Sequence, residues 1–423
     1  MCEKKLGNRW LVVFGALLIQ LCLGAIYAWG AFTGALQDPN GPFGYSASQT
    51  SWIFSTGLAT FAVVMILAGR LQDKYGPRII AIIGGVLLGA GYMLAGLTGT
   101  SFVLMLVFIG VLGGAGIGMG YVCPIAACVK WFPDLKGFMT GLAVAGFGAG
   151  AFIFVKLAGA WGGLIENHGV NQTFFIFGII FIVAVVVGAM FLSNPPAGWE
   201  PAGWKSSVAA ASSSKTPVRD MTQGETVRTL QFWLIWLAFV FSAGCGLMVI
   251  KCLKNFGVFE LHLTPAAAGS ALGLLALFNG LGRVVWGTLS QKLTAKRAVV
   301  LMCLLQGGMM FFLPTLGSTP ASLSIAACWV GFNFGGNFAL FPLLTLENFG
   351  QKNLGANYGA VFTSYGVGGI IGPVMAGRVW DAAGTFKTAF VVAGIACIVA
   401  ALLAFCLRPK PGVVAAEAAS LCK

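Results

Sequence analysis

Long apolar segments alternate with short polar ones along nearly the whole chain. From Trp10 to Leu407, segments of about 20 residues recur in which charged side chains are almost absent. Unpaired backbone groups are costly in hydrocarbon, so each segment predicts a helix that crosses a bilayer. We predict twelve such helices, at 10–35, 48–68, 78–98, 101–129, 136–160, 171–193, 229–253, 265–289, 297–316, 320–346, 354–376 and 386–407.

Composition supports lipid as the main solvent. Of 423 residues, 58% are hydrophobic and only 9% are charged, and the mean hydropathy is +0.89. A water-soluble domain of this length would not show that balance. The first apolar segment lacks a small-residue cleavage site and exceeds a signal-peptide core, so we expect it to remain as helix 1. The predicted fold class is an all-α membrane protein.

The basic residues predict the orientation. Counting along twelve crossings places most of the 25 lysines and arginines on one side of the membrane. The positive-inside rule then puts both termini in the cytoplasm of a cell bearing this protein in its plasma or bacterial inner membrane. This topology accounts for the net charge of +13 without nucleic acid as a partner. The basic residues expected on the outer side are Lys156, Lys251, Lys254, Arg378 and Lys387.

Two halves are related by one offset. A shift of 218 residues places Gly69 on Gly287, and the same shift places a second set of glycines on another. We therefore expect two parallel six-helix repeats around a central cavity. The predicted divisions are a first bundle at 1–193, a cytoplasmic linker at 194–228, a second bundle at 229–407 and a cytoplasmic tail at 408–423. The glycines of the second set are Gly137, Gly141, Gly148 and Gly150, which fall on Gly355, Gly359, Gly366 and Gly368.

A loop motif is expected between the second and third helices. Residues 69–78 read Gly-Arg-Leu-Gln-Asp-Lys-Tyr-Gly-Pro-Arg. They resemble the G-x-x-x-D-[RK]-x-G-x-[RK] signature of the major facilitator superfamily. Asp73 can pair with basic groups or cap a helix, and so hold the halves together in one carrier state; a solvated turn is the alternative. The second copy carries Gln291 instead. The proposed gating residues are Gly69, Asp73, Lys74, Gly76 and Arg78.

Three further stretches narrow the resemblance. They are residues 7–10 (Gly-Asn-Arg-Trp), residues 130–137 (Lys-Trp-Phe-Pro-Asp-Leu-Lys-Gly) and residues 355–359 (Gly-Ala-Asn-Tyr-Gly). Together they resemble the oxalate:formate antiporters and the related monocarboxylate transporters, including bacterial ones. The resemblance implies a carrier of small carboxylates that works by alternating access.

Arg283 is the clearest ionisable residue inside a predicted span. A charge at mid-bilayer costs about 2.5–3.5 kcal/mol even on lenient scales, so we expect a function for it. The planar guanidinium suits a carboxylate, and Asn279 lies one turn earlier on the same face. The alternative is that Arg283 extends to the membrane surface and fixes helix depth. All acidic residues fall in expected loops, termini or helix ends, which leaves proton symport and anion exchange both open.

The remaining binding residues are implied by the resemblance. Aromatic cavity positions of the related carriers correspond here to Tyr27, Tyr121, Phe334, Phe338 and Phe362. The oxalate-carrying branch has a lysine where this chain has Tyr365. One fixed cation with hydroxyl donors matches a single carboxylate, so lactate-like monocarboxylates are the expected substrates.

Other classes of function are less consistent with the sequence. The two histidines, His168 and His262, are expected in outer loops, and the eleven cysteines show no metal-ligand spacing. We therefore expect no enzyme activity, no metal and no cofactor, and a monomer whose partners are the carboxylate, a proton under the symport alternative, and the lipid bilayer. An oxalate:formate type antiporter remains the alternative within transport, and a transporter-like sensor the alternative outside it.

Overall fold

The computed structural model describes residues 8–159, 161–196, 199–201, 220–315 and 319–407. Within these ranges it contains twelve helical spans. Within these ranges every regular element is helical. The predicted fold class and the twelve crossings are confirmed, since each span is long and apolar enough to cross a membrane. Residues 202–219 of the predicted linker and the predicted tail at 408–423 lie outside the described ranges.

The first six spans contain short irregular turns. The first span contains the 3₁₀ turn η1 (Gly24–Ala28), and the fourth contains a π-helical segment, η2 (Leu106–Gly113). The helices are α1 (Arg9–Leu23), α2 (Trp29–Gln37), α3 (Ala47–Tyr75), α4 (Pro77–Leu97), α5 (Phe102–Met105), α6 (Gly114–Trp131), α7 (Lys136–Ala158) and α8 (Leu164–Phe191).

The second six spans follow the short helix α9 (Gln223–Thr226). The seventh and ninth spans end in irregular turns, η3 (Phe256–Glu260) and η4 (Leu313–Thr315). The helices are α10 (Leu230–Asn255), α11 (Pro265–Leu293), α12 (Ala295–Phe312), α13 (Pro320–Phe349), α14 (Leu354–Ala383) and α15 (Lys387–Phe405).

Several helices extend past their predicted ends. The motif from Gly69 to Lys74 was expected in a loop, but α3 continues to Tyr75, and only Gly76 makes the turn. Its φ of 88° suits glycine, and Pro77 starts α4 because a proline needs no hydrogen bond at that position. His168 lies in a short helical segment before Gly169, whose φ of 76° and ψ of 172° interrupt α8. Hydropathy predicts the part of a helix that lies in hydrocarbon, and the helix can continue beyond that part into water.

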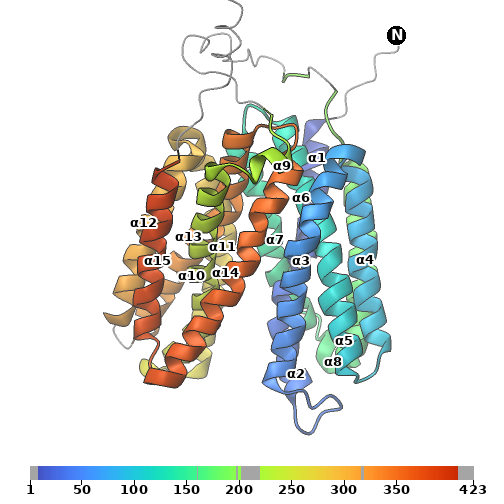
Figure 1. Ribbon diagram of the computed structural model, residues 1–423. Coiled ribbons are helices and arrows are strands. Elements are labelled where there is room, and N and C mark those ends of the chain that lie inside the picture. Colours follow the sequence, from blue (N-terminus) through green and yellow to red (C-terminus); the bar gives the residue numbers. More distant parts are fainter. Residues whose placement is uncertain (1–7, 160, 197–198, 202–219, 316–318, 408–423) are drawn as a thin grey trace, which may run out of the picture.

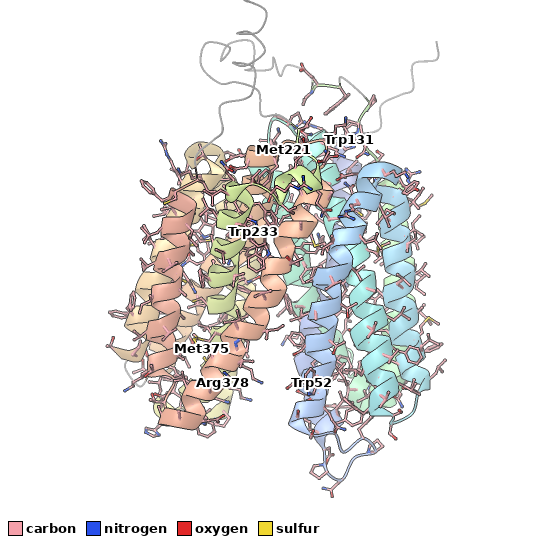
Figure 2. All side chains as sticks on the ribbon, viewed as in Figure 1. Trp52, Trp131, Met221, Trp233, Met375 and Arg378 are labelled. Carbon is pink, nitrogen blue, oxygen red and sulfur yellow. The ribbon has the colours of Figure 1, made fainter. Side chains whose placement is uncertain are left out.

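Figure 1 shows α1–α8 and α10–α15 as two groups of helices, with α9 at one end of the molecule and α2 at the other. We call these the α9 end and the α2 end. The helices α3 and α14 approach one another near α9 and diverge toward α2. Just past the middle of α14, Ile370 and Ile371 are 60% and 54% exposed. Figure 2 places Trp52 of α3 and Arg378 of α14 on opposite sides of this separation.

The two groups meet at the α9 end through glycines. A Cβ on Gly69 of α3 would lie 2.0 Å from the carbonyl oxygen of Gly355 on α14. A Cβ on Gly287 of α11 would lie 2.4 Å from the carbonyl oxygen of Gly137 on α7. The offset of 218 residues relates these two contacts to each other. The interface therefore has the near-symmetry that the repeat predicts.

The same symmetry locates Arg283. A Cβ on Gly359 would lie 2.5 Å from the carbonyl oxygen of Met65, and a Cβ on Gly141 would lie 2.3 Å from that of Arg283. Under the same offset Gly141 corresponds to Gly359, and Met65 corresponds to Arg283. Arg283 thus stands at the interface between the groups, at the place that a methionine occupies in the first repeat.

Candidate functional site

The Arg283 side chain is fully buried between the two groups of helices. Its Nε and Nη2 donate hydrogen bonds of 3.1 and 2.9 Å to Oδ1 of Asn279, one helical turn earlier on α11. Its Nη1 donates a 2.6 Å hydrogen bond to the carbonyl oxygen of Val144 on α7. The guanidinium therefore points into the protein and bridges the groups, which contradicts the alternative that it extends to the membrane surface.

Part of the hydrogen-bonding capacity of Arg283 is unused. A guanidinium has five N–H groups, of which Asn279 and Val144 engage three. One N–H on each terminal nitrogen has no hydrogen-bond partner among the described residues. The described part of the chain also gives Arg283 no salt bridge. The site thus presents a buried, uncompensated positive charge with two donors, an arrangement that suits an anion.

Aromatic rings enclose the guanidinium. The Cζ atom of Arg283 lies 4.3 Å from the ring centroid of Phe338 on α13 and 5.6 Å from that of Phe147 on α7. Both distances allow cation–π attraction. Phe338 contacts Phe334 at a centroid distance of 5.4 Å and Tyr365 at 5.4 Å. These rings exclude water from the charge, which strengthens any electrostatic contact made there.

Tyrosines from both groups complete the enclosure. The hydroxyl of Tyr27 in η1 forms a short hydrogen bond with that of Tyr365 in α14. Phe362 packs between Tyr365, at a centroid distance of 5.1 Å, and Tyr121 of α6, at 5.3 Å. All eight residues proposed from the sequence therefore belong to one connected cluster around Arg283. Whether they contact a substrate stays a prediction.

The structure adds residues that the sequence analysis missed. Phe147 contacts Arg283, Tyr27 and Tyr121, and Phe61 contacts Tyr121. Tyr358 is a fourth tyrosine of the cluster, and its ring centroid lies 5.7 Å from that of Phe362. The helical register of α7 could have indicated Phe147, which lies two turns after Thr140 and close to the Gly141 contact. The sequence gives no such indication for the Val144 carbonyl oxygen, because every residue has a backbone carbonyl group.

The motif residues divide into two sets. Oδ2 of Asp73 accepts a 2.8 Å hydrogen bond from the backbone N–H of Ala356, in the first turn of α14, and Gly69 packs on Gly355. Lys74 is exposed beside the ring of Tyr75. Nε of Arg78 donates a 3.2 Å hydrogen bond to the carbonyl oxygen of Leu192, after α8. Of the five proposed gating residues, all of which the structure describes, only Asp73 and Gly69 thus contact the other group of helices, and a gating role for the motif stays a prediction.

A segment of the predicted linker lies across the same contact. We call residues 220–226 the strap; Figure 2 shows its Met221 at the α9 end. The backbone N–H of Met221 donates a 2.9 Å hydrogen bond to the Phe349 carbonyl. Gln223 donates 2.8 Å to the Ala356 carbonyl and accepts a hydrogen bond from Arg70 of α3. The strap therefore bonds to the start of α14 and to the end of α3 at once.

Comparisons with known proteins agree with this arrangement. The chain matches the Major Facilitator Superfamily over residues 9–373 and, in an overlapping match, 256–421. It is 32% identical over 370 residues to the uncharacterized MFS-type transporter YhjX of Escherichia coli (strain K12), covering 86% of each chain. It is 27% identical to the oxalate:formate antiporter of Oxalobacter formigenes, covering 96% of this chain and 93% of that one. Identity to monocarboxylate transporter 12 of Rattus norvegicus is 24%, covering 94% and 85%.

A solved structure gives the same fold. The crystal structure of the MFS transporter FucP in the outward conformation matches with a TM-score of 0.67 at 17% identity, covering 94% of this chain and 99% of FucP. The family match, with twelve apolar spans, makes the chain a multi-pass membrane transporter, a class of protein that is not an enzyme. The chain belongs to the Major Facilitator Superfamily. The resemblance inferred from the sequence motifs is therefore confirmed.

Proposed function

We propose that this transporter carries small monocarboxylates such as lactate by alternating access, and that Arg283 binds the carboxylate. The observation that carries the proposal is the fully buried guanidinium with two unused donors and no acidic partner among the described residues. A carboxylate would satisfy both donors in bidentate fashion and neutralise the charge.

Electrostatics favour exchange of one anion for another. Without a bound anion the buried guanidinium has no counter-charge, and its desolvation destabilises the closed state of an empty carrier. A bound carboxylate removes most of that penalty, so the loaded carrier reorients more readily. Proton-linked transport remains the alternative form of coupling, with the proton carried by the substrate or by water.

The substrate class follows from the number of fixed cations. Tyr365 stands where the resemblance to oxalate carriers would place a lysine, so Arg283 is the one cation that the described residues bring to the cluster. One cation suits one carboxylate, and the rings of Phe338 and Phe147 suit a short aliphatic part. Relatives named as a monocarboxylate transporter and as an oxalate:formate antiporter support carboxylates as the class.

Topology is part of the same proposal. The basic residues assign the α9 end to the cytoplasm, with both termini there, in a plasma or bacterial inner membrane. The contacts between α3 and α14, and between α7 and α11, then close the cytoplasmic side. We infer that the first repeat at 1–193 and the second at 229–407 rock against one another as a monomer, with Asp73 and Gly69 as part of the cytoplasmic gate.

Counterflow in proteoliposomes tests the proposal. The purified protein should exchange internal lactate for radiolabelled external lactate, and lactate, pyruvate, formate and oxalate should be compared with and without a pH gradient. Arg283→Lys should lose most of the flux, because a point charge cannot reproduce the guanidinium fork. Arg378→Lys, at the exposed α2 end, is the matched control and should keep it.

Three other outcomes distinguish the alternatives. Exchange of oxalate for formate without lactate flux would support the dicarboxylate antiporter. Lactate binding without flux would support a sensor. Normal lactate flux in Arg283→Lys would remove Arg283 from the binding site.

A further inference from the structure

The strap, residues 220–226, is anchored to the second group of helices. Oδ1 of Asp220 accepts hydrogen bonds of 2.8 and 3.0 Å from two backbone N–H groups in the turn before α14. The carbonyl oxygen of Met221 accepts 3.0 Å hydrogen bonds from the side-chain amides of Asn353 and Asn357. All four donors lie in or just before the first turn of α14, and after the strap the chain continues into α10. The strap should therefore move with the second group.

Gln223 of the strap also contacts the first group of helices. Its Oε1 accepts a hydrogen bond from Nε of Arg70 on α3, and its Nε2 donates a 2.8 Å hydrogen bond to the carbonyl oxygen of Ala356 on α14. The Gln223 side chain is 9% exposed, although it lies in a linker between the two groups. The amide thus uses its oxygen toward the first group and its nitrogen toward the second.

The same residue of α14 receives a second contact from α3. The backbone N–H of Ala356 donates a 2.8 Å hydrogen bond to Oδ2 of Asp73, while its carbonyl oxygen accepts from Gln223. Arg70 and Asp73 are three residues apart on α3 and so share one face of that helix. The helix α3 therefore reaches Ala356 directly through Asp73 and indirectly through the Arg70–Gln223 pair. Separation of α3 from α14 at the α9 end would break both connections.

We propose that Gln223 is a positioning residue of the gate at the α9 end: through Arg70 it fastens the strap to α3 and so stabilises the state that is closed at that end. The inference rests on the alternating-access part of the proposed function and adds a linker residue to a gate assigned so far to the motif. The Arg70–Gln223 hydrogen bond exists only while α3 and α14 are together, so it stabilises one carrier state and not the other. Its loss should shift the population toward the state that is open at the α9 end.

The test measures the populations of the two states without any substrate. Spin labels attached through unnatural amino acids at Trp52 of α3 and Arg378 of α14 report the separation at the α2 end, which should shorten when the α9 end opens. In Gln223→Ala the ratio of short to long distances should rise about fivefold. Arg70→Ala, at an exposed position, should give the same shift. The matched control is Lys352→Ala, which leaves in place the backbone N–H that bonds to the strap.

The double variant Arg70→Ala with Gln223→Ala shows whether the two residues act as a pair. If they act through their hydrogen bond, the double variant should shift the ratio no further than either single variant. Fully additive shifts would overturn the proposal. An unchanged ratio in Arg70→Ala would do so as well, even if Gln223→Ala failed to fold.

The outcomes separate this inference from the proposed function, because the distances are measured in the absence of substrate. A protein that shows the paired shift but moves no carboxylate keeps the role of the strap and loses the proposed substrate. Carboxylate exchange with no shift in either single variant keeps the proposed function and removes Gln223 from the gate. A wild-type protein that holds the long distance with and without carboxylate would overturn alternating access and the role of the strap together.

Discussion

Nη1 of Arg283 and the carbonyl oxygen of Val144 form a 2.6 Å hydrogen bond that joins α11 to α7. The same guanidinium that is proposed to bind the substrate thus also joins the two groups of helices. An anion that takes the free N–H of Nη1 would share this nitrogen with Val144, so the binding site and the contact between the repeats involve the same group. The bond uses a backbone acceptor, and side-chain substitution at position 144 does not remove it.

Asn279→Asp would place a carboxylate against this guanidinium. Oδ1 of Asn279 already accepts from Nε and Nη2, so an aspartate there would form an internal ion pair. The internal anion opposes binding of a second one, and we expect affinity for lactate to fall at least tenfold at neutral pH. The empty carrier should then reorient more freely. Isothermal titration and net efflux without external substrate measure the two effects.

The control for that substitution is Asn279→Ser, which removes the amide without adding charge. It should weaken binding less than Asn279→Asp and should not increase net efflux. Equal behaviour of the two variants would contradict the role of charge.

Tyr365→Lys should move the substrate preference toward dicarboxylates. It adds a second cation beside Phe338 and breaks the hydrogen bond to Tyr27. Two cations compensate two carboxylates, so oxalate exchange should rise relative to lactate exchange by tenfold or more. Tyr365→Phe serves as the control, since it breaks the same hydrogen bond without a charge. No gain of oxalate flux in a well-folded Tyr365→Lys protein would count against single-cation selectivity.

Gly69→Ala should prevent closure of the α9 end. Its Cβ would lie 2.0 Å from the Gly355 carbonyl oxygen, far inside contact distance, so α3 and α14 would have to separate. We expect at least a tenfold loss of exchange and greater solvent access at the α9 end, measured by labelling of single cysteines introduced there. Gly273→Ala, in α11, is the control because nothing lies within 4 Å of its Cβ position. Wild-type exchange in Gly69→Ala would show that this contact is dispensable.

Glu260→Gln should lower the stability of the protein and leave the response of transport to a pH gradient unchanged. Glu260 accepts hydrogen bonds from the Phe386 backbone N–H, at 2.6 Å, and from the Thr385 hydroxyl, at 2.7 Å, so it caps the start of α15. A neutral amide weakens this cap, and the free energy of unfolding should fall by about 1 kcal/mol. Thermal unfolding in detergent measures it, with the exposed Glu166→Gln as control. A lost response to a pH gradient would instead give Glu260 a part in coupling.

The sequence was informative where the signal is local. Hydropathy predicts the twelve crossings because lipid imposes the same requirement on each, and Arg283 stands out because a charge in such a span is costly. Helix ends were less predictable, as with Gly69 to Lys74, since a helix need not end where hydrocarbon does. The strap and Tyr358 could not be predicted, because their roles depend on which distant helices meet. The offset of 218 residues is an intermediate case, since it correctly anticipated which glycines are equivalent.

Arg283 and Met65 occupy equivalent positions in the two repeats, so at this position the second repeat carries a positive charge and the first carries none. The ionic contact of a bound anion would be with α11, so in the proposed cycle the anion follows the second repeat. Arg283 and the anion that neutralises it then move through the membrane field as a neutral pair, and the loaded half-cycle displaces little net charge. The rate of exchange should therefore depend only weakly on the membrane potential.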